Sequence, residues 1–337
     1  MKVLIYYPNT KKSRDFEGAR VRKNLKGACE LLHFPYTDDP LAVNYDMVIL
    51  VAVNSKVDLV VRQALKDRKP IVVWALRCEN DPEAQMIDYI KGLPLLKKKV
   101  QKVMNQASAV VVPSELSKGF LRYAGVETPI EIVEDGVNLS RYDKTKSLEM
   151  SIFYRYFQVK KDRKFVVSSG TYVDVEGLHD LMKVARNMPD IDFYFFGDKL
   201  LPAWKLTPFL RLEKTAPKNL HFSDIVTDDV FRSALMNAEA FLELGHKFAG
   251  NMTLLDVAAA KLQVIARKQA IFPDIFINQK TAYLESNTAD IEKRLEQYLN
   301  HEIPSLVEEA YLAVKPYDLH HLGEKLYAIY ESVHKVS

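Results

Sequence analysis

Short runs of apolar, largely β-branched residues recur along the chain, and polar or helix-starting residues follow each of them. The runs in the first half are Val3–Tyr7, Met47–Val51, Ile71–Ala75, Ala109–Val112 and Ile130–Val133. The runs in the second half are Phe165–Ser168, Asp192–Phe196, Leu220–Phe222, Ala240–Leu244 and Gln263–Ala266. Continuous apolar runs of this length predict strands that are buried on both faces of parallel sheets.

The segments between these runs carry apolar residues at helical spacing. The predicted helices include Ala19–Leu32, Val57–Asp67, Glu115–Tyr123, Leu178–Asn187, Asp229–Ala238 and the amphipathic Leu322–Val336. Strands that alternate with helices indicate an α/β fold, and two doubly wound domains are more natural than one very long sheet. The charged and aromatic stretch between Arg141 and Lys164 is the predicted connector, helical or extended, between domains 1–150 and 160–318.

Composition narrows the class of protein. The chain has 337 residues, 48% hydrophobic and 27% charged, which is typical of a globular protein. A net charge of +3 gives no argument for nucleic-acid binding. Cys29 and Cys78 provide neither a disulfide framework nor metal-ligand spacing. With no signal peptide and no apolar run of about 18 residues, we expect a cytoplasmic protein.

The segment Leu255–Ala266 carries the most informative chemistry, because it is predicted to form a helix, a tight turn and a buried strand. Asp256 lies in the first turns of this helix. The residues before it form a predicted loop and N-cap: Gly250, Asn251, Met252 and Thr253. A helix N-terminus can hold phosphate, and a nearby carboxylate can bind ribose hydroxyls. The segment therefore predicts a nucleotide-diphosphate site.

Two further patterns support this interpretation. A strand, a Ser N-cap, a helix ending in glycine, a strand and a glycine turn run from Val110 to Asn138. A second strand leads into the loop Gly170–Leu178. Any α/β domain could supply such parts, but their order resembles the retaining glycosyltransferases of the GT-B fold, the group 1 or family 4 class.

The resemblance implies two Rossmann-like domains that face each other across a cleft, with helix 320–337 joined to the N-terminal domain. The N-terminal domain would bind the acceptor, and the C-terminal domain would bind a nucleotide-diphosphate sugar without a metal or another cofactor. Transfer would retain the anomeric configuration. The donor-binding residues expected from the motif positions and from the loop before the donor helix are Gly18, Gly170, Thr171, Asp198, Lys247, Phe248, Gly250, Asn251, Met252, Thr253 and Asp256.

The chain departs from the family where the family holds the diphosphate and the donor sugar. Thr171 stands at the usual arginine, Glu176 at the usual lysine, and Phe248 at the first glutamate of the donor helix, or Lys247 if the alignment shifts by one. Breaking a sugar–phosphate bond builds negative charge on phosphate, so cations are needed there. His246 and Lys247 are the candidate catalytic residues, although both also fit an ordinary surface loop. The other possible phosphate contacts are Arg20, Arg267 and Lys268.

Three functions follow from these patterns. The favoured one is a hexosyltransferase with rewired phosphate contacts, acting on a glycan, lipid-linked or small-molecule acceptor in glycoconjugate or polysaccharide biosynthesis. A non-catalytic GT-B partner subunit and a sugar-nucleotide epimerase are the alternatives. The basic amphipathic segment 93–103 would suit peripheral contact with the inner membrane face, or would form an ordinary solvated helix surface. No nucleic-acid partner is expected.

Overall fold

The computed structural model divides the chain into two compact units. Unit 1 comprises Met1–Asn138 and Pro316–Ser337, and unit 2 comprises Leu139–Lys315. The residues that the structure describes are 1–7, 16–51, 53, 56–75, 93–134, 136–142, 147–159, 163–172, 175–198, 203–224, 226–246, 253–268 and 275–335.

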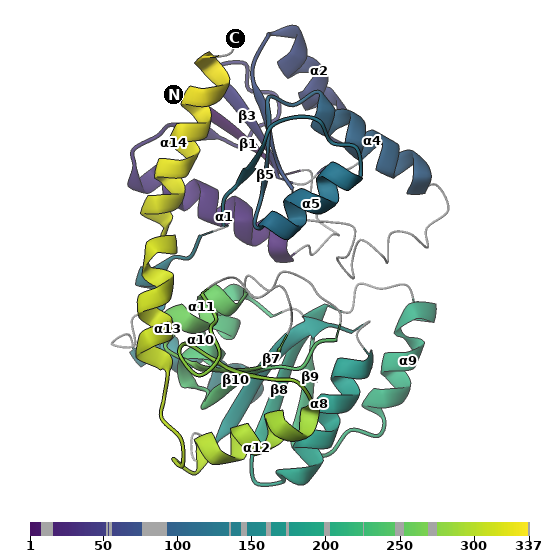
Figure 1. The fold of residues 1–337 in the computed structure, drawn as a ribbon, viewed down its shortest axis with the longest axis vertical. Coiled ribbons are helices and arrows are strands. Elements are labelled where there is room, and N and C mark those ends of the chain that lie inside the picture. Colours follow the sequence, from purple (N-terminus) through teal and green to yellow (C-terminus); the bar gives the residue numbers. More distant parts are fainter. Residues whose placement is uncertain are drawn as a thin grey trace. The chain divides into compact units, whose positions relative to one another are not determined.

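Unit 1 is built on a six-stranded parallel sheet with the order β2-β1-β3-β4-β5-β6 (Figure 1). Its strands are β1 (Val3–Tyr6), β2 (Tyr36–Thr37), β3 (Met47–Val51), β4 (Ile71–Trp74), β5 (Ala109–Val112) and β6 (Ile130–Ile132). Every residue of β3, β4 and β5 is buried. These strands are therefore apolar throughout rather than alternating, because helices cover both faces of the sheet.

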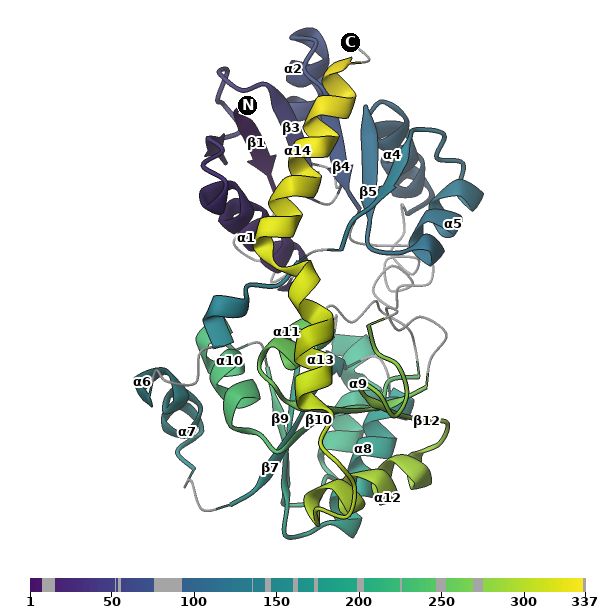
Figure 2. The ribbon, with the colours of Figure 1, turned by 60° about the vertical axis from the view of Figure 1, so that its left-hand side comes forward.

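Helices from different parts of the chain cover the two faces of this sheet. One face packs against α1 (Phe16–Leu31) and α14 (Leu319–Lys335), which lie side by side (Figures 1 and 2). The opposite face packs against α2 (Asp58–Lys66), α4 (Leu93–Asn105) and α5 (Glu115–Tyr123). The final helix thus completes the core of unit 1, through buried residues such as Leu322 and Leu326.

Unit 2 has a second six-stranded parallel sheet, with the order β12-β11-β10-β7-β8-β9 (Figure 1). Its strands are β7 (Phe165–Thr171), β8 (Asp192–Asp198), β9 (Leu220–Ser223), β10 (Ala240–Glu243), β11 (Gln263–Arg267) and β12 (Tyr283–Glu285). One face packs against α8 (Val175–Asn187), α9 (Ala203–Glu213) and α12 (Thr288–Leu299).

The other elements of unit 2 include the connector and three helices of the later sequence. They are η1 (Leu139–Tyr142), α6 (Ser147–Met150), α7 (Ile152–Phe157), α10 (Asp228–Asn237), α11 (Thr253–Ala259) and α13 (Val307–Val314). The short η2 (Lys315–Tyr317) begins with the last residue of unit 2, continues into unit 1 and leads into α14. Phe153 of α7 is fully buried, stacks on Phe165 at 4.4 Å and meets Tyr194 edge-on at 4.9 Å. This aromatic contact holds the connector against the sheet of unit 2.

The predicted α/β class with two parallel sheets is confirmed, and so are all ten strands inferred from apolar runs. The observed strand ends differ from the predicted ones by up to three residues. The largest difference is at β7, which continues to Thr171 where the sequence predicts an end at Ser168. The described part of the chain also has two strands that the apolar pattern did not predict, β2 and β12. Both lie at sheet edges and are only two and three residues long. Such short segments carry no usable periodicity.

Candidate functional site

The order of the strands in unit 2 locates the candidate site. The chain builds β7, β8 and β9 in one direction and then returns to place β10, β11 and β12 on the other side of β7. Open parallel sheets bind ligands beyond the carboxyl ends of the strands where the order reverses. Here the reversal lies between β7, which ends at Thr171, and β10, which ends at Glu243.

The predicted residues Gly170, Thr171 and Asp198 lie at this carboxyl edge. Gly170 pairs with Gly197, and Thr171 pairs with Asp198, in adjacent positions of β7 and β8. A Cβ atom on Gly197 would lie 2.9 Å from the carbonyl oxygen of Gly170 and 2.7 Å from the ring of Tyr172. Glycine at position 197 is therefore required for the close approach of the two strand ends.

Tyr172 fixes the chain directly after β7. Its side chain is fully buried, and its hydroxyl group donates a hydrogen bond to the carbonyl oxygen of Ser223 at 2.5 Å. Moving the end of β7 would expose this ring to water and break the hydrogen bond, and both changes cost free energy. The backbone at Gly170 and Thr171 is thus held on a rigid support.

Asp256 lies half-buried in the first turn of α11, next to η1. Arg141 of η1 forms an ion pair with Asp228. Burial alone would lower the pKa of the Arg141 guanidinium, but the nearby charges of Asp228, Tyr142 and Asp256 and the hydrogen bond to Asp228 raise the pKa overall. Asp256 therefore contributes to the electrostatic environment of a permanently charged arginine.

Arg232 of α10 holds the backbone of η1 at Arg141. It is 8% exposed, and its guanidinium donates to the carbonyl oxygen of Arg141 at 3.0 Å and to the carboxylate of Glu149 at 2.8 Å. A buried guanidinium needs such partners, because an uncompensated buried charge is costly. Through these two hydrogen bonds, Arg232 joins η1, α6 and α10 into one polar cluster beside α11.

The predicted catalytic residue His246 follows β10 and contacts helix α8. Its Nε2 atom lies 2.6 Å from Oδ2 of Asp180, and its Nδ1 atom lies 3.9 Å from Oε2 of Glu176. Glu176, at the position where the family has lysine, is 74% exposed in its side chain. The structure thus brings His246 and Glu176 together at the switch point, with Asp180 as a residue that the sequence analysis did not identify.

Arg267, a predicted phosphate contact, ends β11 and is mostly buried. Its Nη2 atom lies 2.6 Å from Oδ2 of Asp180 and donates to the hydroxyl oxygen of Thr288 at 3.0 Å. Its Nε atom donates to the carbonyl oxygen of Leu244 at 3.3 Å. The guanidinium therefore already has protein partners, whereas the neighbouring Lys268 has an exposed side chain.

The remaining predicted residues divide into three groups. In unit 1, a Cβ on Gly18 would lie 2.6 Å from the ring of Tyr7, and Arg20 donates to the carbonyl oxygen of Gly136 at 3.3 Å. Thr253 begins α11 in unit 2. The other predicted donor or catalytic residues lie outside the described residues: Lys247, Phe248, Gly250, Asn251 and Met252.

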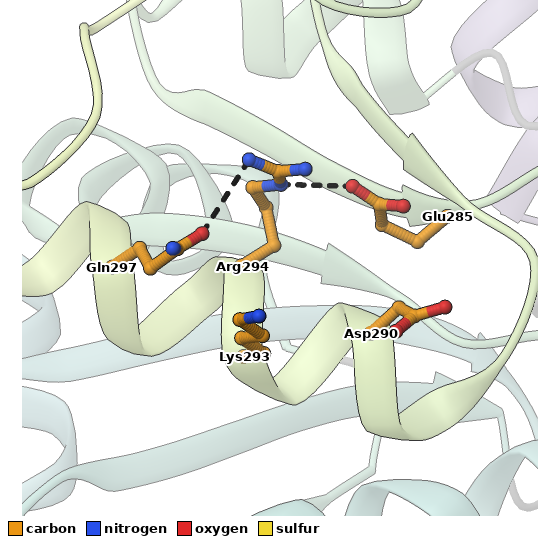
Figure 3. Close-up of a pocket in the computed structure, with 5 residues that line it drawn as sticks. All are labelled: Glu285, Asp290, Lys293, Arg294 and Gln297. Atoms are coloured by element: carbon orange, nitrogen blue, oxygen red, sulfur yellow. Dashed lines mark hydrogen bonds and ion pairs between the residues drawn. The ribbon is translucent and has the colours of Figure 1, made fainter.

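A small surface pocket in unit 2 lies apart from these positions (Figure 3). It encloses about 180 Å³ between the end of β12 and helix α12, and Glu285, Asp290, Lys293, Arg294 and Gln297 line it. Arg294 reaches from α12 to the carboxylate of Glu285 at 2.8 Å and to the side-chain oxygen of Gln297 at 3.4 Å. The pocket contains none of the predicted site residues.

Two further features concern the part of the chain that the structure describes. No group of three or more histidine, cysteine, aspartate or glutamate side chains gathers there as a metal site. No helix within the same residues is long and apolar enough to cross a membrane. The expectation that the protein needs no metal stays a prediction.

The two parallel six-stranded sheets, each covered by helices, define the GT-B class of fold. Over its whole length the chain is 24% identical to a processive diacylglycerol alpha-glucosyltransferase of Acholeplasma laidlawii, 99% of which is covered. No family model matches the chain. The chain thus has the GT-B fold and is similar to this glucosyltransferase along its whole length.

Solved structures agree with this assignment of the fold. The Anabaena protein HepE, in a complex with UDP-glucose, superposes with a TM-score of 0.72 at 14% identity, covering 98% of this chain and 100% of the other. A glycosyltransferase from Rickettsia africae gives a TM-score of 0.68 at 13% identity, covering 100% and 99% of the two chains. The predicted GT-B architecture is thereby confirmed.

Proposed function

We propose that this chain transfers glucose from UDP-glucose to a hydroxyl group of a membrane lipid, with retention of the α configuration. The observation that carries the proposal is the full-length similarity to a processive diacylglycerol alpha-glucosyltransferase. The fold similarity to HepE, whose structure holds UDP-glucose, supports the same donor. The lipid oxygen would bond to C1 of glucose as the bond from C1 to the phosphate oxygen breaks, releasing UDP and a proton.

The donor would bind at the switch point of unit 2. Asp256 offers a carboxylate for the ribose hydroxyls, and the supported strand ends at Gly170 and Thr171 offer backbone close to the diphosphate. Lys268 is the exposed cation at the end of β11 and is the candidate for the developing phosphate charge. Arg267 would act less directly, since its guanidinium is bonded to Asp180 and Thr288.

A surface on unit 1 suits an acceptor that lies in an anionic membrane. Lys98 and Lys102 of α4 are exposed, and Lys99 is linked to Asp58 of α2 at 2.6 Å. Next to Asp58, the side chain of Leu59 is 78% exposed. We call these exposed residues of α2 and α4 the basic surface. Exposed lysines beside an apolar side chain favour contact with anionic headgroups and the outer part of the acyl region.

Vesicle sedimentation tests this part of the proposal. We expect the protein to bind phosphatidylglycerol vesicles and not phosphatidylcholine vesicles. Replacing Lys98 and Lys102 by Glu should weaken binding about tenfold or more, since each lysine contributes about 1 kcal/mol near such a surface. The matched control is Lys325→Glu, an exposed lysine on α14 at the opposite face of the sheet. Equal loss in both variants would exclude the basic surface.

The reaction itself is tested by product analysis. The protein is incubated with UDP-glucose and mixed micelles of diacylglycerol or monoglucosyldiacylglycerol, with and without EDTA. We expect a glucosylated lipid by mass spectrometry, an α-anomeric coupling constant by proton NMR and no effect of EDTA. A β-linked product would contradict retention, and the absence of product with intact UDP-glucose would contradict the proposed acceptor.

One observation favours a second candidate, a GT-B subunit without catalytic activity. Glu176 places an exposed carboxylate where the family has the lysine that holds the diphosphate. A carboxylate there repels phosphate. This candidate predicts no nucleotide binding, no glucosylated product from the protein alone and a stable protein partner.

A further inference from the structure

The helical part of the connector, α6 and α7, carries a row of apolar side chains that is largely exposed. Ser151 lies between the two helices and keeps helical dihedral angles, with φ of −81° and ψ of −9°. Its carbonyl oxygen accepts a hydrogen bond from the backbone of Arg155 at 3.1 Å. Side chains four residues apart therefore lie on one side of residues 147–157. Along this side, Leu148 is 70% exposed, Ile152 is half-buried and Tyr156 is 54% exposed.

The other side of these residues is fixed to unit 2. The buried ring of Phe153 stacks on Phe165 of the sheet. The hydroxyl group of Ser233 on α10 accepts a hydrogen bond from the backbone of Phe153 at 3.0 Å and donates one to the carbonyl oxygen of Met150 at 2.9 Å. Asn237 donates to the same carbonyl oxygen at 2.9 Å. Figure 2 shows α6 and α7 beside α10 at the outer side of unit 2. The exposed apolar row is thus held on a rigid support.

The connector also concentrates the positive charge of the chain. Residues 144–164 include seven lysines and arginines and two acidic residues, so their net charge of +5 exceeds the +3 of the whole chain. Four of these lysines lie outside the described residues: Lys144, Lys146, Lys160 and Lys161. The remainder of the chain is therefore slightly acidic, and the connector is its basic segment.

Among the described residues, two cations accompany the apolar row. Arg155 is exposed and adjoins Tyr156 in α7, and Lys164 is exposed directly before Phe165, the residue on which α7 packs. The carboxylate of Glu149 on α6 is 2.8 Å from the guanidinium of the buried Arg232, so its charge is compensated within unit 2. The exposed side of α6 and α7 therefore combines apolar and positively charged side chains.

We propose that this side of the connector binds the surface of an anionic lipid bilayer. We call it the connector surface, and it consists of Leu148, Ile152, Arg155, Tyr156 and Lys164. Its cations attract anionic headgroups, while its leucine and tyrosine side chains enter the outer part of the acyl region. A nucleic acid would use the cations alone, because its phosphates offer no partner to an apolar row. The inference rests on the proposed membrane acceptor and adds a contact from unit 2, whereas the basic surface belongs to unit 1.

Sedimentation with phosphatidylglycerol vesicles tests the two parts of the connector surface separately. The variant Arg155→Glu/Lys164→Glu should bind about tenfold more weakly or worse, because two attractive charges become repulsive. The variant Leu148→Ala/Tyr156→Ala should bind several-fold more weakly and keep the salt dependence of the wild type, because it removes only apolar contacts. Circular dichroism checks that both variants are folded.

The matched control is Arg211→Glu/Lys214→Glu, which makes the same change of charge on unit 2. Arg211 lies on α9 and Lys214 directly follows this helix, and both are exposed. Helix α9 packs in a cluster with Val166 and Phe193, whereas α7 packs on their neighbours in the same strands. Since successive side chains of a strand point to opposite faces, the control lies on the other face of the sheet and should bind like the wild type.

A tryptophan probe tests whether the apolar row enters the bilayer. Tyr156→Trp should lose more fluorescence than the wild type when the vesicles carry bromine on the upper acyl chain. Leu312→Trp is the matched control, because this position on α13 is 59% exposed and lies outside the connector surface. Trp74 and Trp204 are present in every variant, so the difference from the wild type reports the added ring.

Three results would overturn the inference. They are equal vesicle binding by the wild type and Arg155→Glu/Lys164→Glu, no added quenching of Tyr156→Trp, and a dimer in solution that Leu148→Ala/Tyr156→Ala dissociates, which would assign the apolar row to a second copy of the chain. Glucosylation of diacylglycerol in neutral detergent micelles needs no anionic bilayer, so it tests the proposed function independently. Absence of product there, with vesicle binding through the connector surface retained, overturns the proposed function alone.

Discussion

Replacement of Glu176 by lysine should tighten UDP binding. The residue is exposed, so its charge acts through solvent, and its carboxylate lies 3.9 Å from Nδ1 of His246, which follows β10. At a separation of about 5 Å in water, the interaction with one phosphate charge is about 0.8 kcal/mol. Changing repulsion to attraction doubles this to about 1.7 kcal/mol, or about 16-fold in affinity, and screening at 0.15 M salt lowers the gain to about fourfold.

The assay is a titration of UDP into wild type and Glu176→Lys at low and at physiological salt. The control is Glu296→Lys, the same charge reversal at an exposed position near the end of α12. We expect a gain that shrinks with salt for Glu176→Lys and little change for the control. Unchanged or weaker UDP binding by Glu176→Lys at low salt would refute the placement of the diphosphate.

Three further predictions concern the folded state. Phe153→Ala should lower the free energy of unfolding by about 3–5 kcal/mol in urea, because it removes a fully buried ring; a loss below 1 kcal/mol would contradict its anchoring role. Burial lowers the pKa of His221 in the folded state. As the pH drops below 6.5, the imidazole is therefore protonated in the unfolded chain before it is protonated in the folded protein, and the free energy of unfolding falls. His221→Phe should remove that part of the pH dependence, and an unchanged pH profile would exclude His221 as its source. Burial and the charge of Glu30 raise the pKa of the Cys29 thiol to about 12. In a Cys78→Ser background, Cys29 should react with a thiol reagent only on unfolding, so rapid labelling of the native protein would disprove its burial.

Local sequence signals predicted much of the fold. Ser114 caps α5 by accepting a hydrogen bond from the backbone of Ser117 at 3.2 Å, as a serine before a helix suggests. Gly125 lies directly after the C-cap of α5 and has a φ of +84°, a conformation that glycine adopts without strain. Each of these signals acts within a few residues, so the sequence alone reveals it.

The polar contacts of the candidate site were less predictable. Asp180 is separated by 66 residues from His246 and by 87 residues from Arg267. No periodicity links such positions, and only the strand order brings them together. The sequence pointed to His246 through its place beside the altered motif of the donor helix and to Arg267 through its place at a strand end. Asp180 instead has the appearance of an ordinary polar residue on an amphipathic helix.

The ion pair of Arg267 could not be predicted from the sequence either. A basic residue at a strand end predicts a phosphate contact, but sequence does not show whether a carboxylate already holds it. In the folded chain the Asp180 carboxylate does so, at 2.6 Å, with the arginine 11% exposed. Its role as a direct phosphate contact therefore stays a prediction, and Lys268 is the more accessible cation.

A thermal-shift titration with UDP, GDP, ADP and dTDP tests most directly the claim that unit 2 binds a nucleotide-diphosphate donor. A ligand bound only by the native state stabilises it by about 2.7 kcal/mol at a hundredfold excess over its Kd. We predict a clear shift with UDP that is lost in Asp256→Lys. No shift with any of the four nucleotides, or an undiminished UDP shift in that variant, would contradict the account.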